Sequence, residues 1–256
     1  QLLVAGTHDT LLCFTNEGKV YWLRVFELPQ GGRASRGKPI VNLIPALKPE
    51  ERITAILRLD AEMVRQRAGG DDEEEADVDT AAVDTEATEV VEDVDVADEA
   101  DSEPHAAEGP FIFMAISNGV VKRTELAKFA RPRSNGQIAV RLQEGEHLVN
   151  VAITQGDEDV VLVAGNGKVV RFKESKVRVM GRTARGVRGM KVAEGEEVIA
   201  LMVPQEGGQM LAASENGYGK RTDLSEFPTK GRGTQGVIGM VVNERNGPLV
   251  GAAQVF

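Results

Sequence analysis

Arginine, lysine and glycine recur together in four loops along this chain of 256 residues. A cationic side chain can pair with an anionic group, and a glycine lets the backbone approach a phosphate closely. The cations of these loops are Arg33, Arg36, Lys38, Arg131, Arg133, Arg178, Arg182, Arg185, Arg188, Lys230 and Arg232. We therefore predict that the loops bind a polyanion through its phosphates.

Residues that could perform catalysis do not form a recognisable site. His8 lies beside Asp9, but no nucleophile motif follows, and we assign the pair to a structural turn. Gly219 and Lys220 resemble the end of a phosphate-binding loop, yet Arg221 stands where Ser or Thr is required. No Cys and His cluster has the spacing of metal ligands. We expect no catalytic residue, metal site or cofactor in this chain.

Each basic loop belongs to a repeated β unit. Hairpin turns are predicted at Gly18, Gly119, Gly167 and Gly217, and the loops close at Gly37, Gly136, Gly186 and Gly236. From the second unit onward the turns are 48 and then 50 residues apart. Strands are predicted after the loops at Pro39–Leu43, Gln137–Leu142, Val187–Val192 and Val237–Val242. The pattern predicts an all-β, propeller-like protein of four-stranded repeats, with about four blades.

We place the blades at residues 1–67, 111–155, 156–205 and 206–256, with an acidic insertion at 68–110. The stretch from Asp71 to Glu108 holds 18 of the 40 acidic residues, so the formal charge of −10 becomes +8 without it. Its composition predicts disorder. Either it is a solvated surface loop with no role, or it mimics DNA and competes for the basic loops.

The remaining composition suits a cytoplasmic protein that does not enter membranes. The single cysteine, Cys13, lies in an apolar run and is expected to be a buried hydrophobe, so no disulfide framework exists. A helix needs about 20 consecutive apolar residues to span a bilayer, and no apolar run in this sequence approaches that length. The chain begins at Gln1, which suggests a fragment.

Basic loops on a radial array of blades would form one continuous basic rim. Aromatic residues make up only 4% of the chain, so the stacking platforms of a single-strand binder are missing and duplex DNA is favoured. Phosphate contacts would hold the duplex without reading its sequence. A curved rim would also bend it, at a cost of roughly 1 to 6 kcal/mol for a site of about 20 to 30 base pairs. A protein-interaction scaffold of propeller type is the alternative.

Three stretches of this sequence resemble the C-terminal domain of the A subunit of bacterial DNA gyrase: LPQGGRASRGKPIVNLIP, GKVVRFKESKVRVMGRTARGVRGMKV and SENGYGKRTDLSEFPTKGRGTQGVIGMVVNERNG. The resemblance implies a β-pinwheel that wraps DNA around its rim with positive handedness, supporting ATP-dependent negative supercoiling. It assigns the DNA contacts to the loop cations named above, of which Arg188 begins a strand.

The same resemblance implies partners for the chain. These are duplex DNA, the rest of the gyrase A protein, and the gyrase B protein in an A2B2 complex at the nucleoid. ATP and Mg would be bound by other domains or subunits, and the isolated domain would be a monomer. Tyr21 and Tyr218 are expected to be packing residues, since the catalytic tyrosine belongs to another domain.

Two features depart from the family pattern. The heptapeptide Gln-Arg-Arg-Gly-Gly-Lys-Gly is absent, and the sequence stops at Phe256, before the last blade expected for gyrase. We therefore expect weaker wrapping than a complete domain gives. The A subunit of topoisomerase IV is the related alternative, because its C-terminal domain binds DNA with little wrapping.

Overall fold

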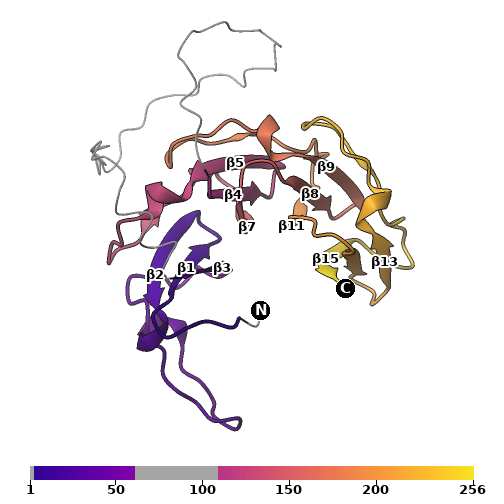
Figure 1. Ribbon diagram of the computed structural model, residues 1–256. Helices are drawn as coiled ribbons and strands as arrows, with labels where there is room; N and C mark the ends of the chain where they lie inside the picture. The colour runs from indigo at the N-terminus through magenta and orange to yellow at the C-terminus, as the bar shows by residue number, and fades with distance from the viewer. Residues whose placement is uncertain (1–2, 61–108) are drawn as a thin grey trace, which may run out of the picture.

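The computed structural model describes residues 3–60 and 109–256, which form four antiparallel β-sheets set side by side along an open arc (Figure 1). The first sheet contains β1 (Thr10–Thr15), β2 (Lys19–Arg24), β3 (Ile53–Leu59) and β6 (Gln137–Ile138). The second contains β4 (Phe111–Ile116), β5 (Val120–Glu125), β7 (Leu148–Thr154) and β10 (Val187–Arg188). The third contains β8 (Asp159–Ala164), β9 (Lys168–Lys173), β11 (Val198–Met202) and β14 (Val237–Ile238). The last contains β12 (Gln209–Ser214), β13 (Gly219–Asp223) and β15 (Leu249–Val255).

Short 3₁₀ helices follow the second strand of each unit. They are η1 (Val25–Glu27), η4 (Leu126–Phe129), η5 (Glu174–Lys176) and η6 (Leu224–Glu226), and η2 (Ile40–Asn42) lies after the first basic loop. None of the helices within the described ranges is long and apolar enough to cross a membrane. The prediction of an all-β fold is confirmed.

The predicted hairpins form at the expected turns. In the third sheet, β8 and β9 pair from Asp159 opposite Lys173 to Val163 opposite Val169, and Gly167 takes a φ of 81° in the turn between them. The first strand of each hairpin is covered on both faces where sheets lie on either side of it. All six residues of β4 are therefore buried, in keeping with the unbroken apolar run of its sequence.

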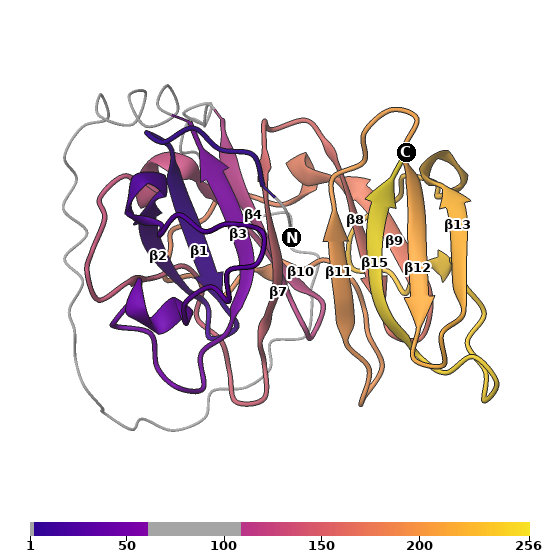
Figure 2. The ribbon, with the colours of Figure 1, turned by 90° about the horizontal axis from the view of Figure 1, so that it is seen from below.

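Hydrophobic cores fill the spaces between successive sheets, which follow one another in a row (Figure 2). Phe14 of the first sheet meets Phe129 of the second unit with ring centroids 6.2 Å apart. Phe113 and Phe172 lie between the second and third sheets, with ring centroids 6.3 Å apart and planes tilted by 49°. A third apolar cluster lies between the third and last sheets, so the four sheets form one curved body.

After the second, third and fourth basic loops, a short strand joins the preceding sheet instead of its own. β6 pairs with β2, β10 with β5 and β14 with β9, so each of these three loops crosses a junction between two sheets. The strands predicted at Gln137–Leu142, Val187–Val192 and Val237–Val242 are accordingly only two residues long. In β6, pairing ends at Ile138 because its partner, Lys19, is the first residue of β2. The next amide, that of Ala139, donates to the carbonyl of Gly18 in the hairpin turn, at 2.8 Å.

The strand predicted at Pro39–Leu43 is wrong, because this stretch contains the 3₁₀ helix η2. Its counterparts in the other units pair with a preceding sheet, and no sheet precedes the first one within the described residues. Ile44 and Leu47 instead pack over Leu11 and Tyr21, so the chain covers the outer face of its own first sheet. The outer face of the first sheet is thus covered by a segment of its own unit.

The predicted insertion at 68–110 lies, up to residue 108, outside the described residues, so its proposed mimicry of DNA stays a prediction. Cys13 is buried as predicted, and burial raises the pKa of its thiol to about 11. Tyr21 is buried and its hydroxyl donates to Glu51 at 2.9 Å. Tyr218 is 40% exposed, and its hydroxyl accepts from Arg245 at 2.9 Å.

Candidate nucleic-acid interface

The second, third and fourth basic loops run along the convex side of the arc, the first projects from the end of the arc at the first sheet, and β3, β7, β11 and β15 line the concave side (Figure 1). This placement follows from strand order: the first strand of each hairpin is central, the last strand of the unit is inside, and the second strand with its exchanged partner is outside. Because the second, third and fourth loops each lead into an exchanged strand, they must pass over the outer edge of the preceding sheet. The fold therefore brings loops from distant parts of the sequence onto one surface.

Ten of the eleven predicted cations are exposed, seven in the loops of the convex side and three in the first loop at the end of the arc, and we call the ten the basic rim. The rim consists of Arg33, Arg36, Lys38, Arg131, Arg133, Arg178, Arg185, Arg188, Lys230 and Arg232. Neighbouring loops are joined by hydrogen bonds. The guanidinium of Arg232 donates to the backbone carbonyls of Lys176 and Arg188, each at 3.1 Å, and Gly233 N donates to Gly189 O at 2.7 Å. The third and fourth loops are therefore held in a fixed relation before any ligand arrives.

Arg182, the eleventh predicted cation, is only 6% exposed. With the Gln137 amide turned to face it, its guanidinium donates to the Gln137 side-chain oxygen, which belongs to the strand of the preceding junction. Its carbonyl accepts a hydrogen bond from Lys122. Arg182 thus braces the third loop, and we leave it out of the basic rim.

Lys122 is the site residue that the sequence reasoning missed. It is completely buried between the second and third units, where its ammonium donates to Ala139 O at 2.8 Å and to Arg182 O. Burial, assisted by the nearby positive charge of Arg182, lowers the pKa of Lys122 to about 7. A signal was present, since Lys122-Arg123 and Lys220-Arg221 follow equivalent turn glycines. Lys220, however, is exposed on the last sheet and donates to Gly239 O at 3.2 Å.

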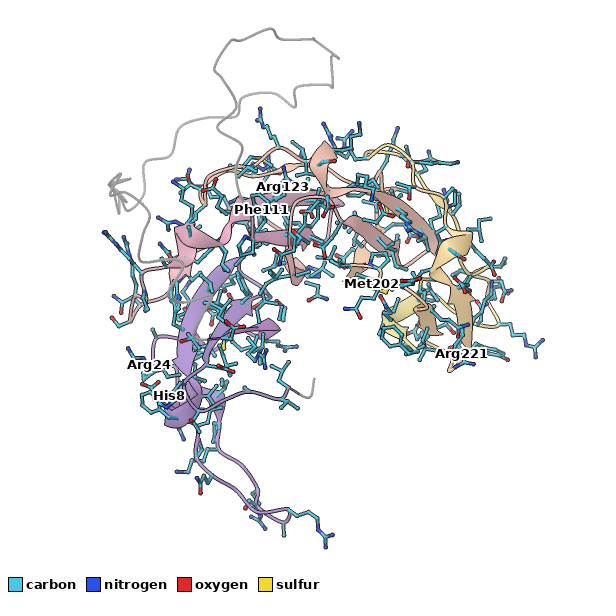
Figure 3. The ribbon with its side chains drawn as sticks, in the orientation of Figure 1. His8, Arg24, Phe111, Arg123, Met202 and Arg221 are labelled. Carbon is cyan, nitrogen blue, oxygen red and sulfur yellow. The ribbon has the colours of Figure 1, made fainter. Side chains whose placement is uncertain are left out.

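Buried polar contacts fix the angle between the second and third sheets. Glu174 is fully buried and accepts from Thr154 Oγ1 at 2.6 Å and from Gly156 N at 2.8 Å. Arg123 lies 3.7 Å from Glu174 and stacks over the ring of Phe111, with its guanidinium carbon 4.7 Å from the centroid (Figure 3). These contacts connect β5, the segment between β7 and β8, and the 3₁₀ helix η5 across the junction.

A different set of contacts holds the third and last sheets. Arg171 pairs with Asp159 at 2.6 Å and donates to the carbonyl of Leu224 at 2.8 Å. Burial by itself would raise the pKa of Asp159, but its hydrogen bonds and ion pairs with Arg171 and Lys173 lower it below the usual value. The curvature of the basic rim therefore rests on charged side chains as well as on apolar packing.

Other candidates from the sequence lie away from this surface. His8 is exposed in a turn on the first sheet, where Gly6 N donates to Asp9 at 2.7 Å, so the predicted structural turn is confirmed (Figure 3). Within residues 3–60 and 109–256, no group of His, Cys, Asp or Glu side chains could hold a metal ion. The arrangement can bind an extended polyanion along its convex side.

Comparison with known proteins gives a family match. The model of the DNA gyrase C-terminal domain, described as a β-propeller, matches residues 9–60, 111–155, 158–205 and 209–255. The DNA gyrase A protein of Pseudomonas aeruginosa is 51% identical over 190 residues, which are 74% of this chain and 20% of that protein. The corresponding gyrase A protein of Escherichia coli is 44% identical over 191 residues, 75% of this chain and 17% of that protein. The chain thus spans about a fifth of the length of the curated relatives it matches.

Solved structures show the same fold. A crystal structure of the C-terminal domain of DNA topoisomerase IV aligns with a TM-score of 0.71 at 24% identity, covering 98% of this chain and 64% of the other. A DNA gyrase A C-terminal domain aligns with a TM-score of 0.67 at 23% identity, covering 98% and 67%. These likenesses establish the propeller-like, β-pinwheel arrangement of the four sheets.

Proposed function

Because the chain belongs to the DNA gyrase C-terminal domain family, we propose that its basic rim binds duplex DNA without sequence specificity, bends it and wraps it around the convex side. The observation that carries this proposal is the exposure of the cations of three successive loops along the convex side, with those of the first loop exposed at the end of the arc. Lysine and arginine on such a surface neutralise phosphates and release counterions, which favours binding most at low salt. Backbone contacts of this kind position a duplex and leave its base sequence unread.

Curvature turns binding into bending. A duplex that touches loops of several units must follow the arc, and the elastic cost of roughly 1 to 6 kcal/mol must be offset by many contacts acting together. The hydrogen bonds that join the third and fourth loops support this, because cations held in place lose little further freedom on binding.

In the longer protein, this chain would serve as the DNA-wrapping part of gyrase A. That protein would act with gyrase B in an A2B2 complex at the nucleoid, where ATP and Mg bound elsewhere drive negative supercoiling. The assignment to gyrase over topoisomerase IV rests on the relatives at 51% and 44% identity, both of which are DNA gyrase A proteins. The topoisomerase IV structure, at 24% identity, supports the fold alone.

Salt-dependent DNA binding tests the proposal. The affinity of the chain for a 30-base-pair (about three helical turns) duplex is measured by fluorescence anisotropy over a range of salt concentrations. Replacing two rim cations, as in Arg178→Ala with Lys230→Ala, should lower the magnitude of the salt slope by about 2, since each phosphate contact contributes about 0.9. In the matched control, Arg52, which precedes the concave strand β3, and Arg58, which lies in β3, are both replaced with Ala. This variant should leave the salt slope unchanged. An equal reduction of the salt slope in both double variants, or no salt-dependent DNA binding by the unmodified chain, would overturn the proposal and favour a protein-interaction scaffold.

A further inference from the structure

An arginine stands four residues before the closing glycine in both the third and the fourth basic loop. It is Arg182 in the third loop and Arg232 in the fourth. Each guanidinium reaches back to the exchanged strand that follows the loop before it. With the amide turned to face it, Gln137 in β6 accepts from Arg182, and the carbonyl of Arg188 in β10 accepts from Arg232. The two arginines therefore have the same place in the repeat and the same kind of contact.

Arg182 shows what an arginine does at this position where a ligand cannot reach it. Its side chain is buried, so its contact with Gln137 serves the protein itself. In the second loop the same position is occupied by Pro132, which has no side-chain donor. That loop is held to the first sheet by Trp22, whose indole nitrogen donates to the carbonyl of Phe129 at 3.1 Å. A link from each of the three convex loops back to the preceding unit is therefore present, by different side chains.

Arg232 joins the two ends of the third loop. Its Nε donates to the carbonyl of Lys176, the last residue of η5, and its Nη1 donates to the carbonyl of Arg188, each at 3.1 Å. The third loop, with its exposed cations Arg178 and Arg185, lies between these two carbonyls in the sequence. A planar guanidinium holds two acceptors in a fixed geometry, whereas the ammonium of a lysine sits on a flexible stem. One side chain of the fourth loop thus fixes the base of the third.

We propose that Arg232 is a positioning residue, which fixes the cations of the third and fourth loops relative to one another so that bound duplex DNA has to bend. This inference rests on the proposed function and gives one rim cation a second role. Its charge attracts phosphates, and its two hydrogen bonds fix the spacing of the loops. Bending a duplex costs elastic energy. Loops that could shift would follow a straighter duplex and keep their phosphate contacts, whereas loops held in place impose the curvature of the arc.

The variant Arg232→Lys, made in the whole chain, separates the two roles because lysine keeps the charge and also binds phosphates. The salt slope of duplex binding should stay unchanged, since the number of neutralised phosphates is the same. Ligation of a nicked circular plasmid at saturating protein should give a smaller linking-number shift than the unmodified chain gives. The control is Arg221→Lys, the same exchange at an exposed arginine of β13 outside the basic rim (Figure 3). It should match the unmodified chain in both measurements.

Amide hydrogen exchange of the free protein gives a readout without DNA. The amide of Gly233 donates to Gly189 O at 2.7 Å, and the amide of Lys191 donates to Thr234 O at 2.9 Å. These two amides therefore report the contact between the fourth loop and the end of the third. In Arg232→Lys both should exchange about fivefold faster, the factor that corresponds to one neutral hydrogen bond. The amides of β8, at the centre of the third sheet, should exchange as in the unmodified chain.

The possible failures are distinguishable. If the unmodified chain shows no salt-dependent DNA binding, the proposed function itself is wrong. If it binds and wraps DNA, and Arg232→Lys gives the same linking-number shift, Arg232 does not set the bend and the positioning role is refuted, whatever its amides do. A smaller salt slope in Arg232→Lys would also contradict the inference, because the variant would then have lost phosphate contacts. A smaller linking-number shift with unchanged exchange of the Gly233 and Lys191 amides would show that the spacing of the loops is not the cause.

Discussion

Replacing the buried Lys122 with methionine should remove a pH dependence of folding stability that the structure builds into the second junction. The ammonium is completely buried, and burial together with the charge of Arg182 lowers its pKa from 10.5 to about 7. In the unfolded chain the same lysine titrates at its ordinary value. Between these two values the unfolded state holds a proton that the folded state has lost, so the free energy of unfolding rises with pH.

The magnitude follows from the size of that window. While only the unfolded state is protonated, stability changes by about 1.4 kcal/mol per pH unit. The unmodified protein should therefore gain about 2 to 3 kcal/mol over Lys122→Met between about pH 7.5 and pH 9.5. Below about pH 7 both states carry the proton, and the difference between the two proteins should level off.

Urea unfolding followed by circular dichroism at a series of pH values measures this difference. The matched control is Lys220→Met, since Lys220 occupies the equivalent place on the last sheet but is exposed. Its pH profile should run parallel to that of the unmodified protein. A constant difference between the unmodified protein and Lys122→Met across this range would refute the reasoning and show that the ammonium remains charged when buried.

The remaining predictions concern the junctions. Gly119→Ala should be strongly destabilising, by about 3 kcal/mol or more, because φ is 86° and a Cβ would lie 2.2 Å from Met190 O. Gly217→Ala has a similar φ of 81° but meets nothing within 4 Å, so it should cost only about 1 kcal/mol, and thermal unfolding of the two variants compares them. Glu146→Gln should raise DNA affinity about twofold at low salt, because the carboxylate that pairs with Arg185 at 3.2 Å is neutralised. Anisotropy titrations measure both affinities. If Glu146→Gln and the unmodified chain bind DNA equally well at low salt, the carboxylate of Glu146 does not weaken DNA binding.

The sequence predicted the parts of the fold that depend on neighbouring residues. The hairpins formed because Asn-Gly turns, such as the one at Asn166, permit the positive φ that the turn needs. The exchanged strands were predicted too long, since their length is set by the strand they join. Ile138 pairs with Lys19, more than a hundred residues earlier, and nothing local to Ile138 records where β2 begins.

The same distinction separates the candidate site into predictable and unpredictable parts. Repetition of cations after the hairpins was enough to predict the basic rim, because solvated loops keep their charges outside. The burial of Lys122 and Arg182 was not predictable, because it depends on contacts across the junction: the Lys122 ammonium reaches the carbonyls of Ala139 and Arg182, 17 and 60 residues away. Charged residues are buried only where such partners exist, and the partners are set by the packing of the blades.

Ligation of a nicked circular plasmid in the presence of the chain measures wrapping directly, because a wrap held during ligation is retained as a change in linking number. The unmodified chain should give a positive shift that grows with protein concentration and falls as salt rises. The variant Arg178→Ala with Lys230→Ala should give a smaller shift, whereas Arg52→Ala with Arg58→Ala should match the unmodified chain. Tight, salt-dependent binding with no shift in linking number would contradict wrapping around the basic rim.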